Sequence, residues 1–382
     1  MSIPFLLVFL VSFGLIVATY VVYPLALSLI PRSRRSLDTR EVFEPTVSIL
    51  IAAFNEGRHI EAKLLSTLAA EYPRDKLEVL VGSDGSTDDT VEKLTDLSDP
   101  RFRLHVFGEN RGKTAVQNDL VARSTGDILV FTDAASFFAP EAIRKLVDNF
   151  RDTRVGCVAG CMRYIGTDTN LTTRSQGLYW RYESMLRSLE SRIGSLIGVD
   201  GPLYAVRREC YVPLEPHMIS DLLTPLLVLE QHRKVVLEPE ALVDENPTEK
   251  VEQEFRTRRR VVLRGLTGIW AYRRLLNPFK HPLLAAQLFL HKLVRWAVGL
   301  LAIVNLMAAS ALSSHWFFVA ITASYGVLFT AAALGWILDR RGLTIRVFAV
   351  PYYFILVNAA ATMAIIDFCR RRRATTWQPT RP

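Results

Sequence analysis

The chain has 382 residues, of which 50% are hydrophobic, and its formal net charge is +8. This length accommodates a full-sized catalytic domain and a further segment, and the apolar residues gather in a few long runs. The basic residues lie beside those runs and the sequence contains no nucleic-acid recognition module, which argues against a nucleic-acid-binding protein. The four cysteines and seven histidines show no metal-ligand or redox spacing.

The first apolar run, residues 4–30, carries no charge and is long enough to cross a bilayer. It lacks a basic n-region and is too long for a signal h-region, so we interpret residues 1–31 as an uncleaved transmembrane anchor. Four arginines follow at once: Arg32, Arg34, Arg35 and Arg40. The positive-inside rule then places the middle of the chain in the cytosol.

Residues 32–280 are predicted to form this cytosolic domain. Short apolar strands alternate there with helices, and we expect the strands at 46–54, 77–84, 102–107 and 127–133. The helices are expected at about 57–71, 88–97 and 113–123. Such alternation predicts an α/β fold with a mostly parallel sheet covered by helices on both faces. Ligands of these sheets bind beyond the carboxyl ends of the strands. Polar residues lie at those ends: Asn55, Glu56, Asp84 and Asp133.

The segment SDGSTDDT (83–90) follows the second predicted strand. Ser86 and Asp89 have the spacing of a capping box for the next helix. We interpret Asp88 and Asp89 as first-turn acids that face the helix dipole, whereas Asp84, at the strand end, is placed to accept hydrogen bonds from a base or a ribose. No G-x-G-x-x-G follows the first strand and no G-x-x-x-x-G-K-[ST] occurs, which argues against a dinucleotide-binding or P-loop enzyme.

Charged residues at two further places each allow two interpretations. Arg111 and Lys113 lie on a glycine-bearing loop that runs into a helix, where they either meet a phosphate group or belong to a solvated turn. Asp221 opens an apolar helix within 218–231. It is either the N-cap, a position that Asp favours, or a general base near the ligand-binding edge of the sheet.

The densest basic stretch is residues 254–265. At helical spacing three of its arginines share one face: Arg256, Arg260 and Arg264. That face either lies on anionic lipid headgroups or grips a pyrophosphate, with Arg258 and Arg259 facing elsewhere.

Residues 281–295 are predicted to be an amphipathic helix that lies in the membrane interface. Its polar side carries four residues: Gln287, His291, Lys292 and Arg295. A C-terminal transmembrane region of about three helices, 296–369, follows. Its apolar runs are 296–313, 316–338 and 345–368.

The orientation of these last runs has one conflict. Arg340 and Arg341 indicate a cytosolic loop before the last run. A last full span places the basic tail, 370–382, outside, against the positive-inside rule. Two alternatives stay open: a last run broken by Pro351, or another turn within 281–313.

Together these residues resemble a membrane-bound family 2 glycosyltransferase, of the group that contains the bacterial cellulose, chitin, hyaluronan and poly-N-acetylglucosamine synthases. The resemblance covers about 45–300 and extends to the flanking spans. It rests on the order of six motifs: AAFNE (52–56), SDGS (83–86), VFTDAAS (130–136), GVDGPLYAVRRE (198–209), ISDLL (219–223) and FRTRRRV (255–261). It implies a GT-A-type glycosyltransferase domain embedded between transmembrane helices.

The resemblance also implies a role for each matching residue. Asp133 is expected to bind Mg²⁺ or Mn²⁺, and Asp221 is expected to be the catalytic base. The residues expected at the nucleotide sugar are Glu56, Asp84, Lys113 and Arg260, the last aligned with the arginine of a Q-x-x-R-W motif. Gly201 and Pro202 are expected at the tip of the acceptor-side segment.

At the metal site the chain departs from the pattern, because Ala135 stands where the D-x-D strand end has its second acid. We expect Asp133 to act together with diphosphate oxygens and water, which magnesium tolerates well. Asp244 and Glu245 could approach the site instead, but we interpret them as an ordinary strand-end pair.

A second departure lies in the basic stretch, where Thr257 and Val261 stand in place of the Gln and Trp of Q-x-x-R-W. In the polymerising members those residues border the acceptor terminus. Their absence argues against long-chain synthesis and leaves open transfer to a lipid or a short lipid-linked acceptor.

The sequence therefore predicts an inverting glycosyltransferase that moves a sugar from a nucleotide sugar, a UDP-sugar, to a polysaccharide, oligosaccharide or lipid acceptor delivered at the membrane. One alternative is a polyprenyl-phosphate or other lipid glycosyltransferase, and another is a non-catalytic membrane subunit that binds a nucleotide sugar. We expect a multi-pass protein of the inner cell membrane, in contact with membrane lipids, with its catalytic domain in the cytosol.

Overall fold

A computed structural model describes residues 2–33, 42–165, 171–245, 250–341, 343 and 345–372. Three arginines of the predicted cytosolic flank, Arg34, Arg35 and Arg40, lie outside the described residues, as does the predicted tail from Arg373 onward.

The chain divides into two compact units. One unit consists of Pro31–Ile165, Glu190–Asn246 and Ala374–Pro382, and the other of Met1–Ile30, Gly166–Leu189 and Pro247–Arg373. The first carries the sheet, and we call it the sheet unit; the second carries the apolar helices, and we call it the helical unit. This division differs from the predicted domain 32–280, because the basic stretch belongs to the helical unit.

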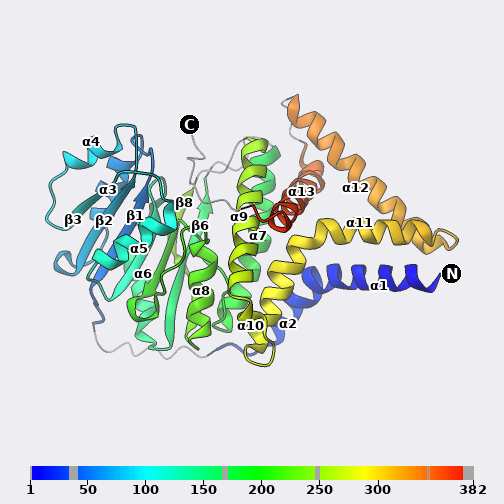
Figure 1. The fold of residues 1–382 in the computed structure, drawn as a ribbon, viewed down its shortest axis with the longest axis horizontal. Helices are drawn as coiled ribbons and strands as arrows, with labels where there is room; N and C mark the ends of the chain where they lie inside the picture. The colour runs from blue at the N-terminus through cyan, green and yellow to red at the C-terminus, as the bar shows by residue number, and fades with distance from the viewer. Residues whose placement is uncertain are drawn as a thin grey trace. The chain divides into compact units, whose positions relative to one another are not determined.

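The sheet unit is built on an eight-stranded sheet of the order β3-β2-β1-β4-β7-β6-β8-β5. The strands are β1 Val47–Ala53, β2 Leu77–Asp84, β3 Phe102–Phe107, β4 Ile128–Asp133, β5 Phe137–Phe138, β6 Val155–Tyr164, β7 Leu203–Arg207 and β8 Lys234–Glu245. β7 and β5 run antiparallel to their neighbours and the other pairings are parallel. The mostly parallel sheet expected from the sequence is thus confirmed (Figure 1).

Helices cover both faces of this sheet. They are α3 Ile60–Leu68, α4 Thr90–Thr95, α5 Lys113–Arg123, α6 Ala142–Asp148 and α8 Ser220–Glu230. Every residue of β1 is buried, which only cover on both faces can produce. Val116 and Leu120 of α5 share one core cluster with Phe131 of β4. Lys63 of α3 reaches Thr132, whose side chain points to the face opposite that of Phe131.

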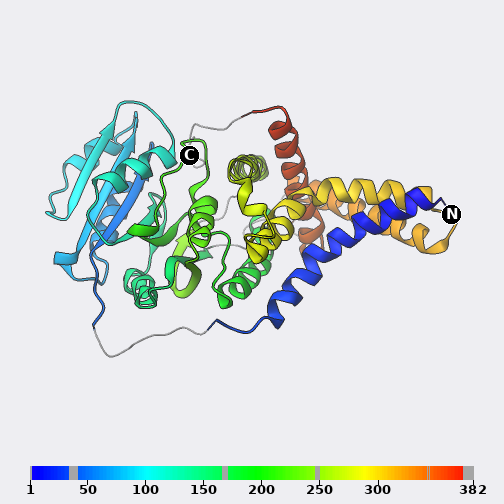
Figure 2. The same ribbon diagram turned by 60° about the horizontal axis from the view of Figure 1, so that its bottom comes forward.

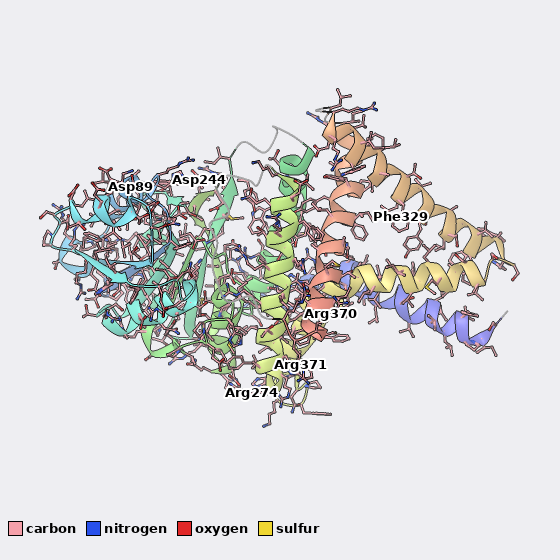
Figure 3. All side chains as sticks on the ribbon, turned by 45° about the horizontal axis from the view of Figure 1, so that its top comes forward. Asp89, Asp244, Arg274, Phe329, Arg370 and Arg371 are labelled. Carbon is pink, nitrogen blue, oxygen red and sulfur yellow. The ribbon has the colours of Figure 1, made fainter. Side chains whose placement is uncertain are left out.

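Of the four strands predicted from the sequence, β3 alone is not mostly buried. Its residues are half-buried or exposed, because β3 is the edge strand and pairs with β2 alone. The strand ends that matter for a ligand, those of β1, β2 and β4, lie further inside the sheet. Asp89 beside α4 and Asp244 near the end of β8 mark the edge at which the parallel strands end (Figure 3).

The helical unit consists of long helices. They are α1 Ile3–Val17, α2 Tyr23–Leu29, α7 Leu171–Arg192 (as far as Leu189), α9 Val251–Ala271, α10 Pro282–Gln287, α11 Arg295–Ala311, α12 Trp316–Arg340 and α13 Ala349–Cys369. π-helical turns join α1 to α2 at Ala18–Val22 and α10 to α11 at Leu288–Val294. α1 runs alongside α11 (Figures 1 and 2).

Within the described residues, four helical segments are long and apolar enough to cross a membrane: Ile3–Leu29, Pro282–Ala311, Trp316–Arg340 and Arg346–Cys369. Many of their apolar side chains are exposed, as on α12, where Phe329 is 44% exposed and stacks on Tyr325 (Figure 3). The structure shows no break at Pro351, which lies in the first turn of α13, where proline breaks no helical hydrogen bond. Pro282–Ala311 is a continuous helical segment that changes direction between α10 and α11, where the π-helical stretch Leu288–Val294 lies (Figure 1).

The expected interfacial helix, 281–295, is the first half of the segment Pro282–Ala311, and its polar side is buried in protein. Gln287 is 0% exposed and His291 is 2% exposed. Arg295 donates a hydrogen bond of 2.6 Å to Glu183 of α7. The polar side therefore contacts α7, which differs from the expected contact with lipid headgroups.

The two arginines of α9 that were expected to face away from its basic face, Arg258 and Arg259, have protein partners. Arg258 donates to Glu254 at 2.7 Å and to the hydroxyl of Tyr353 at 3.0 Å. Arg259 donates to Asp367 at 2.6 Å. Since Tyr353 and Asp367 belong to α13, these arginines hold α9 and α13 together.

Candidate active site

Three side chains of the sheet unit converge at one glycine. The position of a Cβ atom on Gly201 lies 3.4 Å from Oδ2 of Asp221, 3.4 Å from Nζ of Lys113 and 3.7 Å from Oδ2 of Asp133. Gly201 is buried and precedes β7, with Pro202 between them. The structure thus brings together the predicted base, the predicted metal ligand, one predicted donor residue and the predicted acceptor-side turn.

Neighbouring elements carry these groups to the same edge. β7 pairs with β4, Leu203 lying opposite Thr132, so the turn before β7 adjoins the end of β4 where Asp133 stands. Lys113 is the first residue of α5 and forms an ion pair with Asp133. The ammonium group of Lys113 therefore faces the same point as the carboxylate, and the interpretation of this loop as a solvated turn is wrong for Lys113.

Asp221 enters the site on α8. The helix begins at Ser220 with Ile219 as its N-cap, so Asp221 is the second helical residue and the N-cap interpretation is wrong. The backbone carbonyl of Asp221 accepts a hydrogen bond of 2.9 Å from the amide of Val199, two residues before Gly201. This bond fixes the start of α8 beside the Gly201 turn.

Asp84 is fully buried at the end of β2 and holds the loop that carries Lys113. Its two carboxylate oxygens accept hydrogen bonds from the backbone amides of Arg111, at 2.9 Å, and Gly112, at 2.8 Å. Gly112 has φ +94°, a conformation that residues with a side chain rarely adopt. In the structure Asp84 orders this loop, and its expected contact with a base or a ribose stays a prediction.

Glu56 follows Asn55 at the end of β1, in a turn that bonds to the segment SDGSTDDT (83–90). Asn55 has φ +54°, which asparagine tolerates better than most residues. The amide of Asn55 donates to the Ser86 hydroxyl at 3.1 Å, and the amide of Glu56 donates to the Thr90 hydroxyl at 2.9 Å. The AAFNE and SDGS motifs therefore form one interlocked structure, with Glu56 partly exposed at the sheet edge.

The expected capping box of Ser86 and Asp89 is not formed. Asp88 instead accepts from the amide and the hydroxyl of Thr90 and from the amide of Gly57. Partial burial disfavours the charged form of Asp88, but these hydrogen bonds outweigh it and lower the pKa of the carboxyl group. Asp88 is thus a structural acid between two motifs.

After Asp133 the chain makes a turn, Asp133–Ser136, that contains Ala135. The Ser136 amide donates to the carbonyl of Asp133 at 3.3 Å, and the Ser136 hydroxyl donates to Glu245 at 2.6 Å. Asp244, one residue earlier on β8, pairs with Arg163 at 2.7 Å. Of the strand-end pair considered from the sequence, Glu245 therefore contacts the turn and Asp244 does not.

The residues present fit a divalent ion that also binds a diphosphate. No group of three His, Cys, Asp or Glu side chains that could hold a metal occurs among the described residues. Asp133 is a partly exposed carboxylate at a strand end, and hard cations such as Mg²⁺ accept one carboxylate together with phosphate oxygens and water. Asp133 is thus the protein group that suits the ion.

Sequence reasoning missed Lys63, which is 0% exposed and bonds to the Asp133–Ser136 turn. Its signal was available: Ile60, Lys63, Leu64 and Thr67 have the spacing of one helix face, and all are buried. A lysine on such a face requires partners. Arg260, by contrast, lies on α9 in the helical unit, and its place at the diphosphate stays a prediction.

A mostly parallel α/β sheet with polar side chains gathered at its carboxyl edge is the architecture of a GT-A-type glycosyltransferase domain, to which this chain adds apolar helices. The fold of the whole chain is similar to that of mannosyltransferase PcManGT from Pyrobaculum calidifontis, solved in complex with GDP-Man and Mn²⁺. The TM-score is 0.68 at 22% identity, over 96% of this chain and 99% of the other. This similarity confirms the predicted GT-A fold.

The sequence comparisons identify the family. The profile described as "Glycosyl transferase family 2" matches residues 48–210. An N-acetylglucosaminyltransferase of Bradyrhizobium elkanii is 30% identical over 131 residues, which are 33% of this chain and 71% of that protein. The chain belongs to glycosyltransferase family 2.

The longer relatives match over a smaller share of their length. The N-acetylglucosaminyltransferase of Neorhizobium galegae is 31% identical over 184 residues, or 47% of this chain. The chain spans only 42% of that relative's length. The family profile, residues 48–210, covers β1 to β7 and ends before α8, which carries Asp221, and before β8.

Proposed function

We propose that the protein transfers a sugar, with inversion, from a nucleotide sugar to a hydroxyl group of an acceptor delivered at the membrane. The observation that carries this proposal is the convergence at Gly201 of a carboxylate on α8, a carboxylate on β4 and an ammonium group on α5. Transfer from a nucleoside diphosphate needs a base for the incoming hydroxyl and positive charge for the departing diphosphate. The carboxylate of Asp221 and the ammonium group of Lys113 both lie within 4 Å of the Cβ position on Gly201.

On the donor side, Lys113 and the sheet edge receive the nucleotide sugar. Lys113 begins α5, so its ammonium group and the helix N-terminus both favour the negative charge of the diphosphate. Asp133 would hold Mg²⁺ or Mn²⁺. When bound, the ion neutralises charge on the diphosphate as it leaves. Glu56 at the end of β1 and Arg260 on α9 are proposed to complete the donor contacts.

On the acceptor side, Asp221 is the general base. It removes the proton of the acceptor hydroxyl as that oxygen attacks the anomeric carbon. The bond from the anomeric carbon to the diphosphate oxygen breaks in the same step, and the electron pair leaves with the nucleoside diphosphate. Attack from the face opposite the leaving group inverts the anomeric configuration. Gly201 leaves room for the two sugars because it carries no side chain between Asp221 and Asp133.

The relatives guide the choice of donor. Relatives that match in sequence are named N-acetylglucosaminyltransferases, which makes UDP-N-acetylglucosamine the first donor to test. The four apolar segments support a membrane-borne acceptor, with the sheet unit on the cytosolic side. We favour a lipid or a short lipid-linked glycan over a long polymer, because Thr257 and Val261 replace the residues that border a polymer terminus.

Release of nucleoside diphosphate from a panel of nucleotide sugars, measured in detergent with Mn²⁺ and membrane lipid extract, tests the proposal. We expect release with one donor and a lipid-soluble glycosylated product by mass spectrometry. Asp133→Ala should abolish release, whereas Asp244→Asn, at the same sheet edge, should leave it unchanged. Tight nucleotide-sugar binding with no release from any donor would instead identify a non-catalytic binding subunit.

A further inference from the structure

Lys63 is a lysine buried beneath the candidate metal site. Its side chain is 0% exposed, and its neighbours Ile60 and Leu64 on α3 are equally buried. The ammonium group donates hydrogen bonds to the hydroxyl of Thr132, at 2.8 Å, and to the carbonyl of Ser136, at 2.6 Å. It also lies 4.5 Å from the centre of the Phe138 ring. These three contacts account for the three N–H groups of a lysine.

The two hydrogen bonds of Lys63 bracket the Asp133–Ser136 turn. Thr132 precedes the turn and Ser136 ends it. Successive residues of a strand point to opposite faces, so Thr132 points toward α3 while Asp133 points toward Gly201 and Lys113. Lys63 therefore bonds to the turn from the sheet face covered by α3, opposite the face on which Asp133 lies.

A lysine is an unfavourable residue for this place if packing alone is considered. Burial lowers the pKa of Lys63 to about 7, although the carboxylates of Asp133 and Glu245 act in the opposite direction. An apolar side chain of similar length would avoid this desolvation. What a lysine provides and an apolar side chain cannot is a hydrogen-bonded link between Thr132 and Ser136.

We infer that Lys63 is a positioning residue for the transfer reaction: it fixes the Asp133–Ser136 turn in the conformation in which a single carboxylate can hold the divalent ion. Ala135 removes the second acid of the usual pair, so the orientation of Asp133 alone determines whether the ion is held. The inference rests on the proposed role of Asp133.

The test measures Mn²⁺ binding by the full chain in detergent with saturating UDP, from the electron paramagnetic resonance signal of free Mn²⁺. Lys63→Met should weaken Mn²⁺ binding by about 10- to 100-fold, the usual effect of removing a group that orients a metal ligand. Thr132→Val, which removes one of the two bonds, should weaken binding less. The control is Thr67→Val, which removes another buried hydrogen bond of α3, to the Lys63 carbonyl.

The variants separate this inference from the proposed function. If Asp133→Ala binds Mn²⁺ as the wild type does, the proposed role of Asp133 is wrong. If Asp133→Ala loses binding while Lys63→Met binds as Thr67→Val does, the inference about Lys63 is wrong and the role of Asp133 stands. Should Lys63→Met fail to fold, Thr132→Val decides: binding equal to that of Thr67→Val overturns the inference, and weaker binding supports it.

Discussion

Lys113 at the start of α5 and Asp133 at the end of β4 form an ion pair at the edge of the sheet. Their side chains are 21% and 32% exposed, so the pair is partly open to solvent. In the proposed reaction Asp133 holds a divalent ion and Lys113 contacts the diphosphate. The two residues must therefore exchange partners: Lys113 leaves Asp133 when the ion and the donor bind. Binding of the ion and of the donor should consequently be coupled.

Lys113→Met should tighten Mn²⁺ binding in the absence of nucleotide, because the competing ammonium group is removed from Asp133. A partly exposed ion pair contributes up to about 1 kcal/mol, so we expect an increase of about two- to fivefold. With Mn²⁺ present, the same variant should bind UDP more weakly than the wild type. Calorimetric titrations with Mn²⁺ alone, and with UDP in the presence of Mn²⁺, measure both changes in affinity. Weaker Mn²⁺ binding without nucleotide would show that Lys113 does not compete for Asp133.

Asp221→Asn should separate catalysis from donor binding. Asparagine preserves the shape of the side chain but cannot take a proton, so we expect transfer to fall by about 10²–10⁴-fold. UDP and Mn²⁺ binding should be unchanged, because the groups proposed to hold the donor remain. Loss of the first-turn acid should destabilise the helix by at most about 1 kcal/mol. Transfer rates, UDP affinity and melting temperature are compared with those of the wild type, and an active variant rules out Asp221 as the base.

The sequence predicted β1 to β4 and the helices between them well, because their apolar runs are bounded by polar residues, but it gave no bounds for β5 to β8. It also placed Asp133 and Asp221 near a ligand. It did not reveal that Lys113, Asp133 and Asp221 meet at Gly201. That meeting depends on β7 inserting antiparallel between β4 and β6, and strand order is not encoded in any local pattern.

Polar side chains on helices were harder to interpret from sequence. Gln287, His291 and Arg295 recur on one helix side, and this pattern is the same whether the side faces lipid headgroups or, as here, a buried glutamate on another helix. The sequence likewise indicated no partner for Arg258 and Arg259, which bond to Glu254 and Asp367 in the structure. Periodicity identifies a polar face, but the partner of that face comes from tertiary structure.

Gly201→Ala should impair transfer without disturbing the fold. The added methyl group would lie 3.4–3.7 Å from the three converging polar groups, which is ordinary van der Waals contact. It would nevertheless fill the space between Asp221 and Asp133 that the reacting groups need. We expect a loss of activity of at least about tenfold, because a displacement on the order of 1 Å at a reacting centre is costly. A melting temperature close to that of the wild type and unchanged turnover would show that the reaction takes place elsewhere.

Arg259→Ala and Arg260→Ala should differ in what they damage. Asp367, the partner of Arg259, has a side chain only 5% exposed, so losing Arg259 should destabilise the protein by about 1–3 kcal/mol. The turnover of Arg259→Ala per folded molecule should be near that of the wild type. Arg260→Ala should lower turnover at saturating donor with a smaller change in melting temperature. Equal losses of stability and turnover in both variants would contradict a diphosphate role specific to Arg260.

Lys63 should make the stability of the protein depend on pH in a defined direction. The pKa of its ammonium group is lowered from 10.5 to about 7 by burial. Between these values the unfolded chain binds a proton that the folded protein has released, so stability rises with pH. Below about pH 7 both states are protonated and this contribution no longer changes with pH.

Wild type should therefore gain stability relative to Lys63→Met as pH rises from 7 to 10.5, since methionine does not titrate. The full pKa difference corresponds to a gain of up to about 5 kcal/mol. Melting temperatures of both proteins in detergent, measured at half-unit pH steps, give this difference directly, because the other titrating groups are common to both and cancel. Thr67→Val, which retains Lys63, should follow the wild-type profile. Parallel profiles of wild type and Lys63→Met across this range would mean that Lys63 stays charged in the folded protein.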